Sequence, residues 1–133
     1  MSAPLLAGLV AQLNATVALT AVCGQSIMPP PAPDNLSEYP ALTYERITWK
    51  EQYDLAGQVS LCDSTVVLTC IAAQYSQCEA MVLAIRNAFS GFRGTLPNGV
   101  VVYLTQIVAM HDLWEPNNQM QSIAVHLQIT FAA

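Results

Sequence analysis

Cysteine and histidine are the residues of this chain best suited to do chemistry. The four cysteines include no C-x-x-C pair, the spacing that zinc sites and dithiol redox sites commonly use. Either Cys62 or Cys70 with His111 would make a nucleophile–base pair if the fold brought them together. We interpret the cysteines as buried thiols that act as small hydrophobic side chains: Cys23, Cys62, Cys70 and Cys78.

Other polar residues give weaker signals for catalysis. His111 and Asp112 are adjacent and have the types of an acid–base pair, but such neighbours are usually a hydrogen-bonded surface pair. Carboxylates that border a predicted hairpin are typical of a solvated rim. The sequence has no glycine-rich phosphate loop, nucleophile elbow, HExxH motif or calcium loop. We therefore predict no enzyme activity, no metal and no cofactor. The bordering carboxylates are Glu45, Glu51, Asp54 and Asp63.

Two segments have the periodicity of helices. Leucines at 5, 9 and 13 predict a helix over 4–14, and apolar residues at helical spacing predict a second over 77–90. Ser76 and Glu79 form a capping-box pattern before the second helix, and Gly91 suits its C-terminal end. Residues 15–28 alternate, which indicates a short strand, and the prolines at 29–33 predict an extended loop.

Four further segments have the pattern of strands. They are 40–49, 61–73, 100–110 and 122–131, of which the last alternates most regularly and places His126 on its polar face. Charges and Gly57 interrupt the pattern over 50–60, residues 96–99 form a turn, and 111–119 is a polar loop. We predict a single α+β domain over 1–133: an antiparallel sheet of about four to five strands with two helices packed on one face.

Composition limits the function classes. The formal charge is −5, charged residues make up 10% and apolar residues 53%, which excludes a disordered chain and disfavours a nucleic-acid reader. No positively charged start precedes the apolar segment near the N-terminus, so we predict no export signal and no membrane association. A surface this poor in charge indicates coverage by partner subunits.

Aromatic residues in the predicted connections are candidates for contacts with a partner. Large aromatics on loops either pack back on the core or anchor a partner. In this chain, the low charge and the length of both connections favour the two roles about equally. The candidate interface residues are Trp49, Tyr53, Asp54, Leu55 and Trp114.

The order of elements resembles a known family. A Leu-Leu helix leads to a proline loop and the segment Tyr39-Pro40-Ala41-Leu42-Thr43-Tyr44. Val66-Val67-Leu68-Thr69-Cys70 then runs into Ala72-Ala73-Gln74-Tyr75-Ser76, a helix over 80–89 and a closing strand over 123–131. This resembles the tail-completion (tail-terminator, head–tail joining) proteins of long-tailed bacteriophages.

The resemblance implies a structural virion protein, assembled in the host cytoplasm and placed at the head–tail junction. It implies a homo-oligomeric ring, usually a hexamer, that ends the tail tube, meets the head connector and lets genomic DNA pass without specific binding. Candidate channel-lining acids are Asp63, Asp112 and Glu115. The alternative is a small oligomeric α+β module that binds a ligand, or an enzyme that uses Cys62 or Cys70.

Overall fold

The computed structural model describes residues 3–24, 26–29, 39–53, 55, 57, 59–115 and 120–132. In these residues the chain forms three helices and six strands: α1 (Ala3–Ala15), α2 (Val17–Cys23), β1 (Ile27–Met28), β2 (Ala41–Tyr53), β3 (Val59–Ala72), α3 (Tyr75–Phe89), β4 (Gly94–Thr95), β5 (Val101–Glu115) and β6 (Met120–Ala132). The α+β class is confirmed, but the predicted strand and helix counts were too low.

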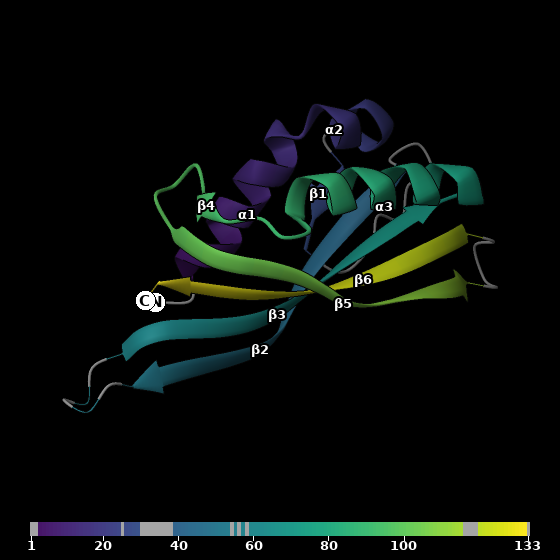
Figure 1. Ribbon diagram of the computed structural model, residues 1–133. Coiled ribbons are helices and arrows are strands. Elements are labelled where there is room, and N and C mark those ends of the chain that lie inside the picture. Colours follow the sequence, from purple (N-terminus) through teal and green to yellow (C-terminus); the bar gives the residue numbers. More distant parts are fainter. Residues whose placement is uncertain are drawn as a thin grey trace.

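One sheet carries the fold. Its strand order is β1-β2-β3-β6-β5-β4, with two antiparallel hairpins, β2–β3 and β5–β6, joined by antiparallel pairing of β3 with β6. β1 pairs with β2 in parallel through two residues only, and β4 pairs with β5 through two. The helices lie together on one face of the sheet, as the apolar stripes predicted (Figure 1).

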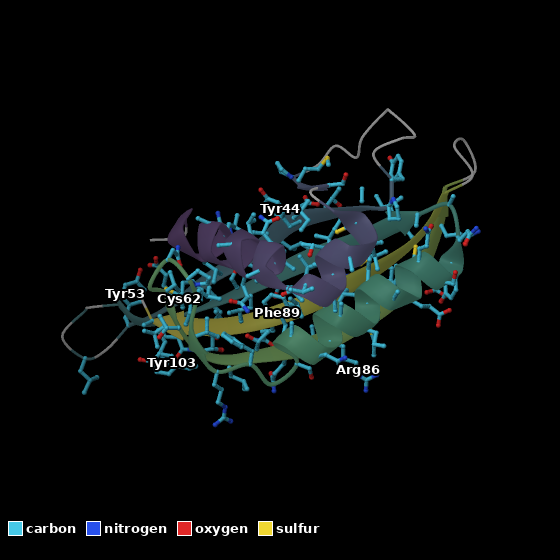
Figure 2. The ribbon with its side chains drawn as sticks, turned by 90° about the horizontal axis from the view of Figure 1, so that it is seen from above. Tyr44, Tyr53, Cys62, Arg86, Phe89 and Tyr103 are labelled. Atoms are coloured by element: carbon cyan, nitrogen blue, oxygen red, sulfur yellow. The ribbon has the colours of Figure 1, made fainter. Side chains whose placement is uncertain are left out.

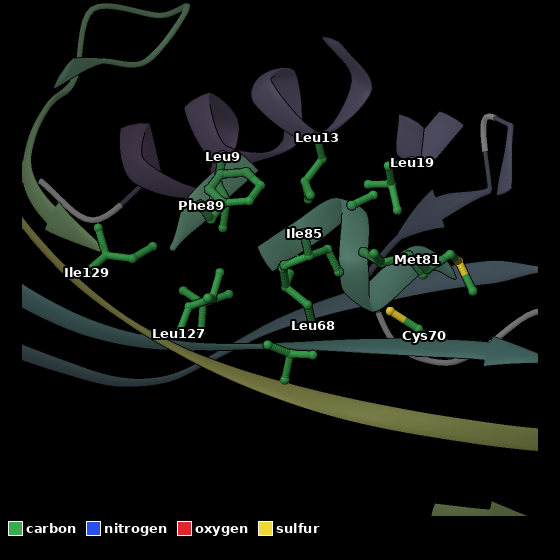
Figure 3. Packing of buried hydrophobic residues seen from close by; sticks show 14 of the residues in the cluster. Leu9, Leu13, Leu19, Leu68, Cys70, Met81, Ile85, Phe89, Leu127 and Ile129 are labelled. Carbon is green, nitrogen blue, oxygen red and sulfur yellow. The ribbon is translucent and has the colours of Figure 1, made fainter. Parts of the chain in front are cut away.

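The core lies between that helical layer and the sheet. Leu5, Leu9 and Leu13 of α1 are buried, as their spacing predicted, and they pack in one cluster with residues of α3 and β6. Figure 3 shows Leu9 close to Phe89, with Ile85 directed toward Leu68. The predicted faces of the last strand are also confirmed, because its odd-numbered residues from 123 to 131 are all buried.

The segment after α1 is a helix and not the predicted short strand. Alternating residues at 17–23 suggested a strand, yet the buried pair Leu19 and Cys23 is four residues apart, which is the helical spacing. Val17 is 78% exposed. Thr16 is extended before α2, and Gly24 follows it at φ 60°. The core beneath this segment therefore selected the helical periodicity.

The predicted capping box does not form. α3 begins at Tyr75, so Ser76 and Glu79 lie within the helix, and the extended residue Gln74 precedes it without a side-chain cap. The backbone N–H groups of residues 77 and 78 donate to the Gln74 carbonyl instead. The prediction for Gly91 is confirmed: its φ is 73°, just beyond the end of α3.

Both hairpins are longer than the sequence pattern indicated. β2 continues to Tyr53 and β5 to Glu115, although 50–60 and 111–119 were predicted as connections. The described side chains of these extensions are not buried in the core, so the alternation fades while the backbone ladder continues. The proline loop predicted at 29–33 lies outside the described residues, apart from Pro29.

Among the described residues, no single helix has the length and apolarity to cross a membrane. The stretches Leu5–Ala15 and Val17–Cys23 meet that test only as a pair, and they are bent by 81° relative to each other.

Candidate assembly surfaces

The β2–β3 hairpin carries the exposed apolar end of the molecule. It projects past the helical layer at the lower left of Figure 1. Tyr53 is 62% exposed and Leu55 is fully exposed. The Tyr53 hydroxyl donates to a carboxylate oxygen of Glu51 at 2.8 Å, and this bond raises the pKa of Tyr53. Trp49 pairs with Ser64 on this hairpin; the Trp49 side chain and all of Asp54 lie outside the described residues.

The fifth predicted interface residue lies elsewhere. Trp114 is on β5 opposite Gln121, so it belongs to a strand and not to the predicted loop; its side chain is outside the described part. Because β3 and β6 are antiparallel, the β5–β6 turn and the β2–β3 turn lie at opposite ends of the sheet. The candidate interface residues therefore form two separate groups.

The candidate channel-lining acids are also separated. Asp63 lies within β3, where its carboxylate accepts bonds from Gln52 Nε2 at 2.8 Å and from Thr130 Oγ1 at 2.6 Å. Asp112 pairs with Ile123 on β6, seven residues from Thr130, which corresponds to about 23 Å along a strand. These acids were expected at strand ends, which is correct only for Glu115, the last residue of β5; Asp63 and Asp112 lie within β3 and β5. The Glu115 side chain is outside the described part.

These acids also lie on different faces of the sheet. Asp112 faces α3, where the Tyr75 hydroxyl donates to both of its carboxylate oxygens at 3.0 and 2.9 Å. Asp63 alternates with the buried Cys62 and Ser64, so it lies on the opposite face. We call that opposite face, on which no described helix packs, the helix-free face.

The helix-free face carries uncharged polar side chains on β3, β6 and β5, with the charged residues Glu45, Lys50 and Asp63 toward β2 and β3. By register and alternation it includes Thr65 and Thr69 of β3, Gln128 of β6 and Gln106 of β5. His111 and His126 also meet here, with ring centroids 5.0 Å apart. His126, predicted on the polar face of the last strand, lies on this face and is half-buried beside its neighbour.

The proposed cysteine–histidine pair does not form. All four cysteines are buried free thiols, and Cys70 packs on the helix side of the sheet, where burial raises its pKa well above the ordinary range. His111 pairs with Ala124, on the other face. Within the part of the chain that the structure describes, no group of three or more histidine, cysteine or acidic residues could hold a metal ion.

An open groove of about 500 Å³ separates α3 from β5. Its lining combines the exposed apolar side chains Tyr75, Leu83 and Met110 with charged Arg86 and Asp112. A ligand-binding alternative has its most favourable site here, because small-molecule sites are concave and mainly apolar with a few polar groups.

Sequence reasoning missed a second set of exposed apolar residues, along the flanking strands β2 and β5. Ile47 and Val108 lie at register shifts, where the alternation of each strand slips by one residue. The only signal in the sequence was that alternation fails near these positions. Exposure there follows from the bulge, which no local pattern specified. The set comprises Ile47, Val101, Tyr103 and Val108.

Comparisons with known proteins agree with this architecture. A solved structure described as the virion of a native gene transfer agent (GTA) particle contains a chain that matches with a TM-score of 0.69 and 16% identity, over 92% of this chain and 90% of that one. No curated protein matches the sequence. The family model described as tail completion protein gp17 matches residues 7–132. The match spans nearly the whole chain and confirms the resemblance noted in the sequence, so the protein belongs to the tail completion protein gp17 family and is a structural protein of the phage virion tail.

Proposed function

We propose that copies of this chain form a ring, of six subunits by the family resemblance, that ends the tail tube and joins it to the head connector, with DNA passing through the centre. Family membership supports the tail role. The structural observation that carries the proposal is the β2–β3 hairpin, whose tip presents Tyr53 and Leu55 to solvent beyond the helical layer. Exposed apolar groups at a projecting tip favour contact with a partner.

The hairpin provides a direct test of assembly. Trp49 and Tyr53 are the proposed anchors toward a neighbouring subunit or the tail tube. Trp49→Ala with Tyr53→Ala should leave the circular dichroism spectrum unchanged and abolish ring formation or tail attachment, measured by analytical ultracentrifugation and electron microscopy. Val17→Ala, an exposed site on α2, is the matched control. A double variant that still completes tails would contradict the role of the hairpin.

We also propose that the helix-free face lines the DNA path. A lining that binds phosphate tightly would stall the passing duplex, and the chain has only four cations. Of these cations, Arg86 lies on α3, away from this face, whereas Lys50 lies on it, paired with the acid Asp63. At physiological salt an electrostatic field decays over about 8 Å, so only acids at the path itself would act on DNA.

Charge-reversal variants test separately whether each of the three candidate acids lines the DNA path. If the helix-free face lines the path, Asp63→Lys should slow genome ejection and make the ring retain DNA. Gln128→Lys, at an exposed site on the same face, should act alike without removing the hydrogen bonds of Asp63. Asp112→Lys, on the helix side, is the matched control, and Glu115→Lys tests the β5–β6 end. Unchanged ejection and no DNA retention in the Asp63 and Gln128 variants would refute this lining.

A further inference from the structure

The long flanking strands of the sheet have largely open edges. β1 pairs only with Leu42 and Thr43 of β2, and β4 pairs only with Val101 and Val102 of β5. The segment before β4 also occupies the β5 edge at Thr105, whose N–H donates to the Phe92 carbonyl at 3.1 Å and whose carbonyl accepts from the Gly91 N–H at 2.8 Å. No described strand pairs with the outer side of β2 from Tyr44 to Tyr53, or with that of β5 from Gln106 to Glu115. Open edges present backbone N–H and C=O groups that can pair with another chain.

The β5 edge lacks two of the features that usually prevent such pairing, charge and proline, although it has register shifts at Tyr103 and Val108. Between Val101 and Met110 it contains no charged residue and no proline, although charges and proline are common protections of an exposed edge. Tyr103 and Val108 on this stretch are 51% and 52% exposed. A long, uncharged and apolar edge of this kind favours contact with a strand of complementary shape.

The exposed apolar residues of the β2 edge lie at the same positions along the strand direction as those of the β5 edge. Ile47, 55% exposed, lies at the register shift of β2, directly after Arg46. Val108 lies at the register shift of β5, directly after Ile107. Ile47 and Val108 are therefore level on opposite edges, because one row of paired residues crosses the four strands: Arg46, Val66, Leu127 and Ile107.

A second match lies at the hairpin end. Gln52 pairs with Leu61, and Leu61 pairs with Ala132, the neighbour of the residue that faces Val102. Tyr53 and Leu55 are thus at the end of the sheet where Val101 and Tyr103 are exposed on β5. Figure 2 shows Tyr53 and Tyr103 toward this same end.

Strand direction completes the match. Three successive antiparallel pairings make β2 and β5 run in opposite directions. A rotation about an axis parallel to the strands preserves their directions, so it would bring β2 of one copy antiparallel to β5 of the next. Apolar side chains would then meet at both positions, with backbone pairing confined to the part of β5 beyond Thr105. Such head-to-tail contacts close into a ring when the rotation closes.

We propose that β2 of one subunit pairs with the part of β5 beyond Thr105 in the next subunit, which places Ile47 against Val108 and lets the side chains of the hairpin tip pack against those of Val101 and Tyr103. The inference rests on the proposed ring and adds which surfaces meet within it. Backbone bonds between the strands would supply affinity, and the apolar pairs would set the register.

Two variants, each altered on one edge only, test this pairing when they are studied alone and as a mixture. Ile47→Glu with Leu55→Glu alters only the β2 edge, and Tyr103→Glu with Val108→Glu alters only the β5 edge. Each variant alone should be monomeric in analytical ultracentrifugation, with an unchanged circular dichroism spectrum. An equimolar mixture should give a heterodimer and nothing larger, because one intact pair of edges remains. Val17→Glu should still form rings.

Engineered cysteines test proximity without disrupting the surface. Ile47→Cys and Val108→Cys lie on opposite edges, so a disulfide between them can form only between copies, and the native cysteines are buried. Oxidation should give a covalent ladder that ends at the ring number, whereas Ile47→Cys with Val17→Cys should give none.

The possible failures are distinguishable. Wild-type rings that yield no ladder, or edge variants that still assemble, would overturn the edge pairing and leave the ring intact. A wild-type chain that stays monomeric, both alone and with purified tail tubes, would overturn the proposed function itself.

Discussion

The Tyr75 hydroxyl donates to both carboxylate oxygens of Asp112, at 3.0 and 2.9 Å, and so joins the first residue of α3 to β5. The two residues are 37 positions apart in the sequence and both are exposed. α3 contacts β3, β5 and β6, and this pair fixes its N-terminal end over the outer strand of the three. The contact also forms one wall of the groove between α3 and β5.

Tyr75→Phe should destabilise the fold in a pH-dependent way. The bond to Asp112 raises the pKa of Tyr75 above 10.0, so the folded state holds the phenolic proton more tightly than the unfolded state does. The stabilisation is therefore complete below pH 10 and is lost as pH rises through the folded pKa. Unfolding by urea should show a difference between wild type and Tyr75→Phe at pH 8 that shrinks above pH 10. Tyr103→Phe is the control, and a difference that grows with pH would contradict this account.

Ile85→Ala should lower the free energy of unfolding by about 2–5 kcal/mol, because it opens a cavity between α3 and the sheet. Ile85 is fully buried, whereas Leu83 on the same helix is 57% exposed. Leu83→Ala should therefore change stability by no more than about 0.5 kcal/mol. Chemical denaturation monitored by circular dichroism measures both, and a loss below 1 kcal/mol for Ile85→Ala would show that this stripe is not core.

The native chain should react slowly with thiol reagents. Burial raises the pKa of all four thiols, so little of the reactive thiolate exists at neutral pH: Cys23, Cys62, Cys70 and Cys78. Labelling with a chromogenic disulfide at pH 7.5 should be slow in the native state, and four thiols per chain should react in guanidinium chloride. A cysteine that reacts in the native chain as fast as free cysteine would disprove its burial.

The effect of Gly8→Ala on the free energy of unfolding should depend strongly on the side chain at position 98. Alanine improves helix propensity by about 1 kcal/mol, but a methyl group at position 8 would overlap the Asn98 side chain and approach Leu96 Cδ1 to 3.0 Å. Gly8→Ala should therefore be less favourable in the wild type than in an Asn98→Ala background, with a coupling of about 1 kcal/mol. Thermal unfolding of the four chains of this cycle measures the coupling, and additive effects would show that the turn moves freely.

The sequence by itself determined those features whose signal lies within a single helix or strand. Leucine spacing gave α1, the alternation of 123–131 gave the buried face of β6, and Gly91 marked the end of α3, because each signal lies within one element. The element order was also sufficient to indicate the phage tail family.

Only the tertiary structure decided which distant residues meet. Register brought Ile47 level with Val108 and placed Asp63 and Asp112 on opposite faces, and it separated Trp114 from the β2–β3 hairpin. Residues 17–23 form a helix because Leu19 and Cys23 pack in the core. α3 begins at Tyr75, after Gln74, and not after the predicted cap Ser76. These outcomes depend on contacts between segments far apart in sequence, whose free energies exceed the weak local preferences on which a sequence pattern rests.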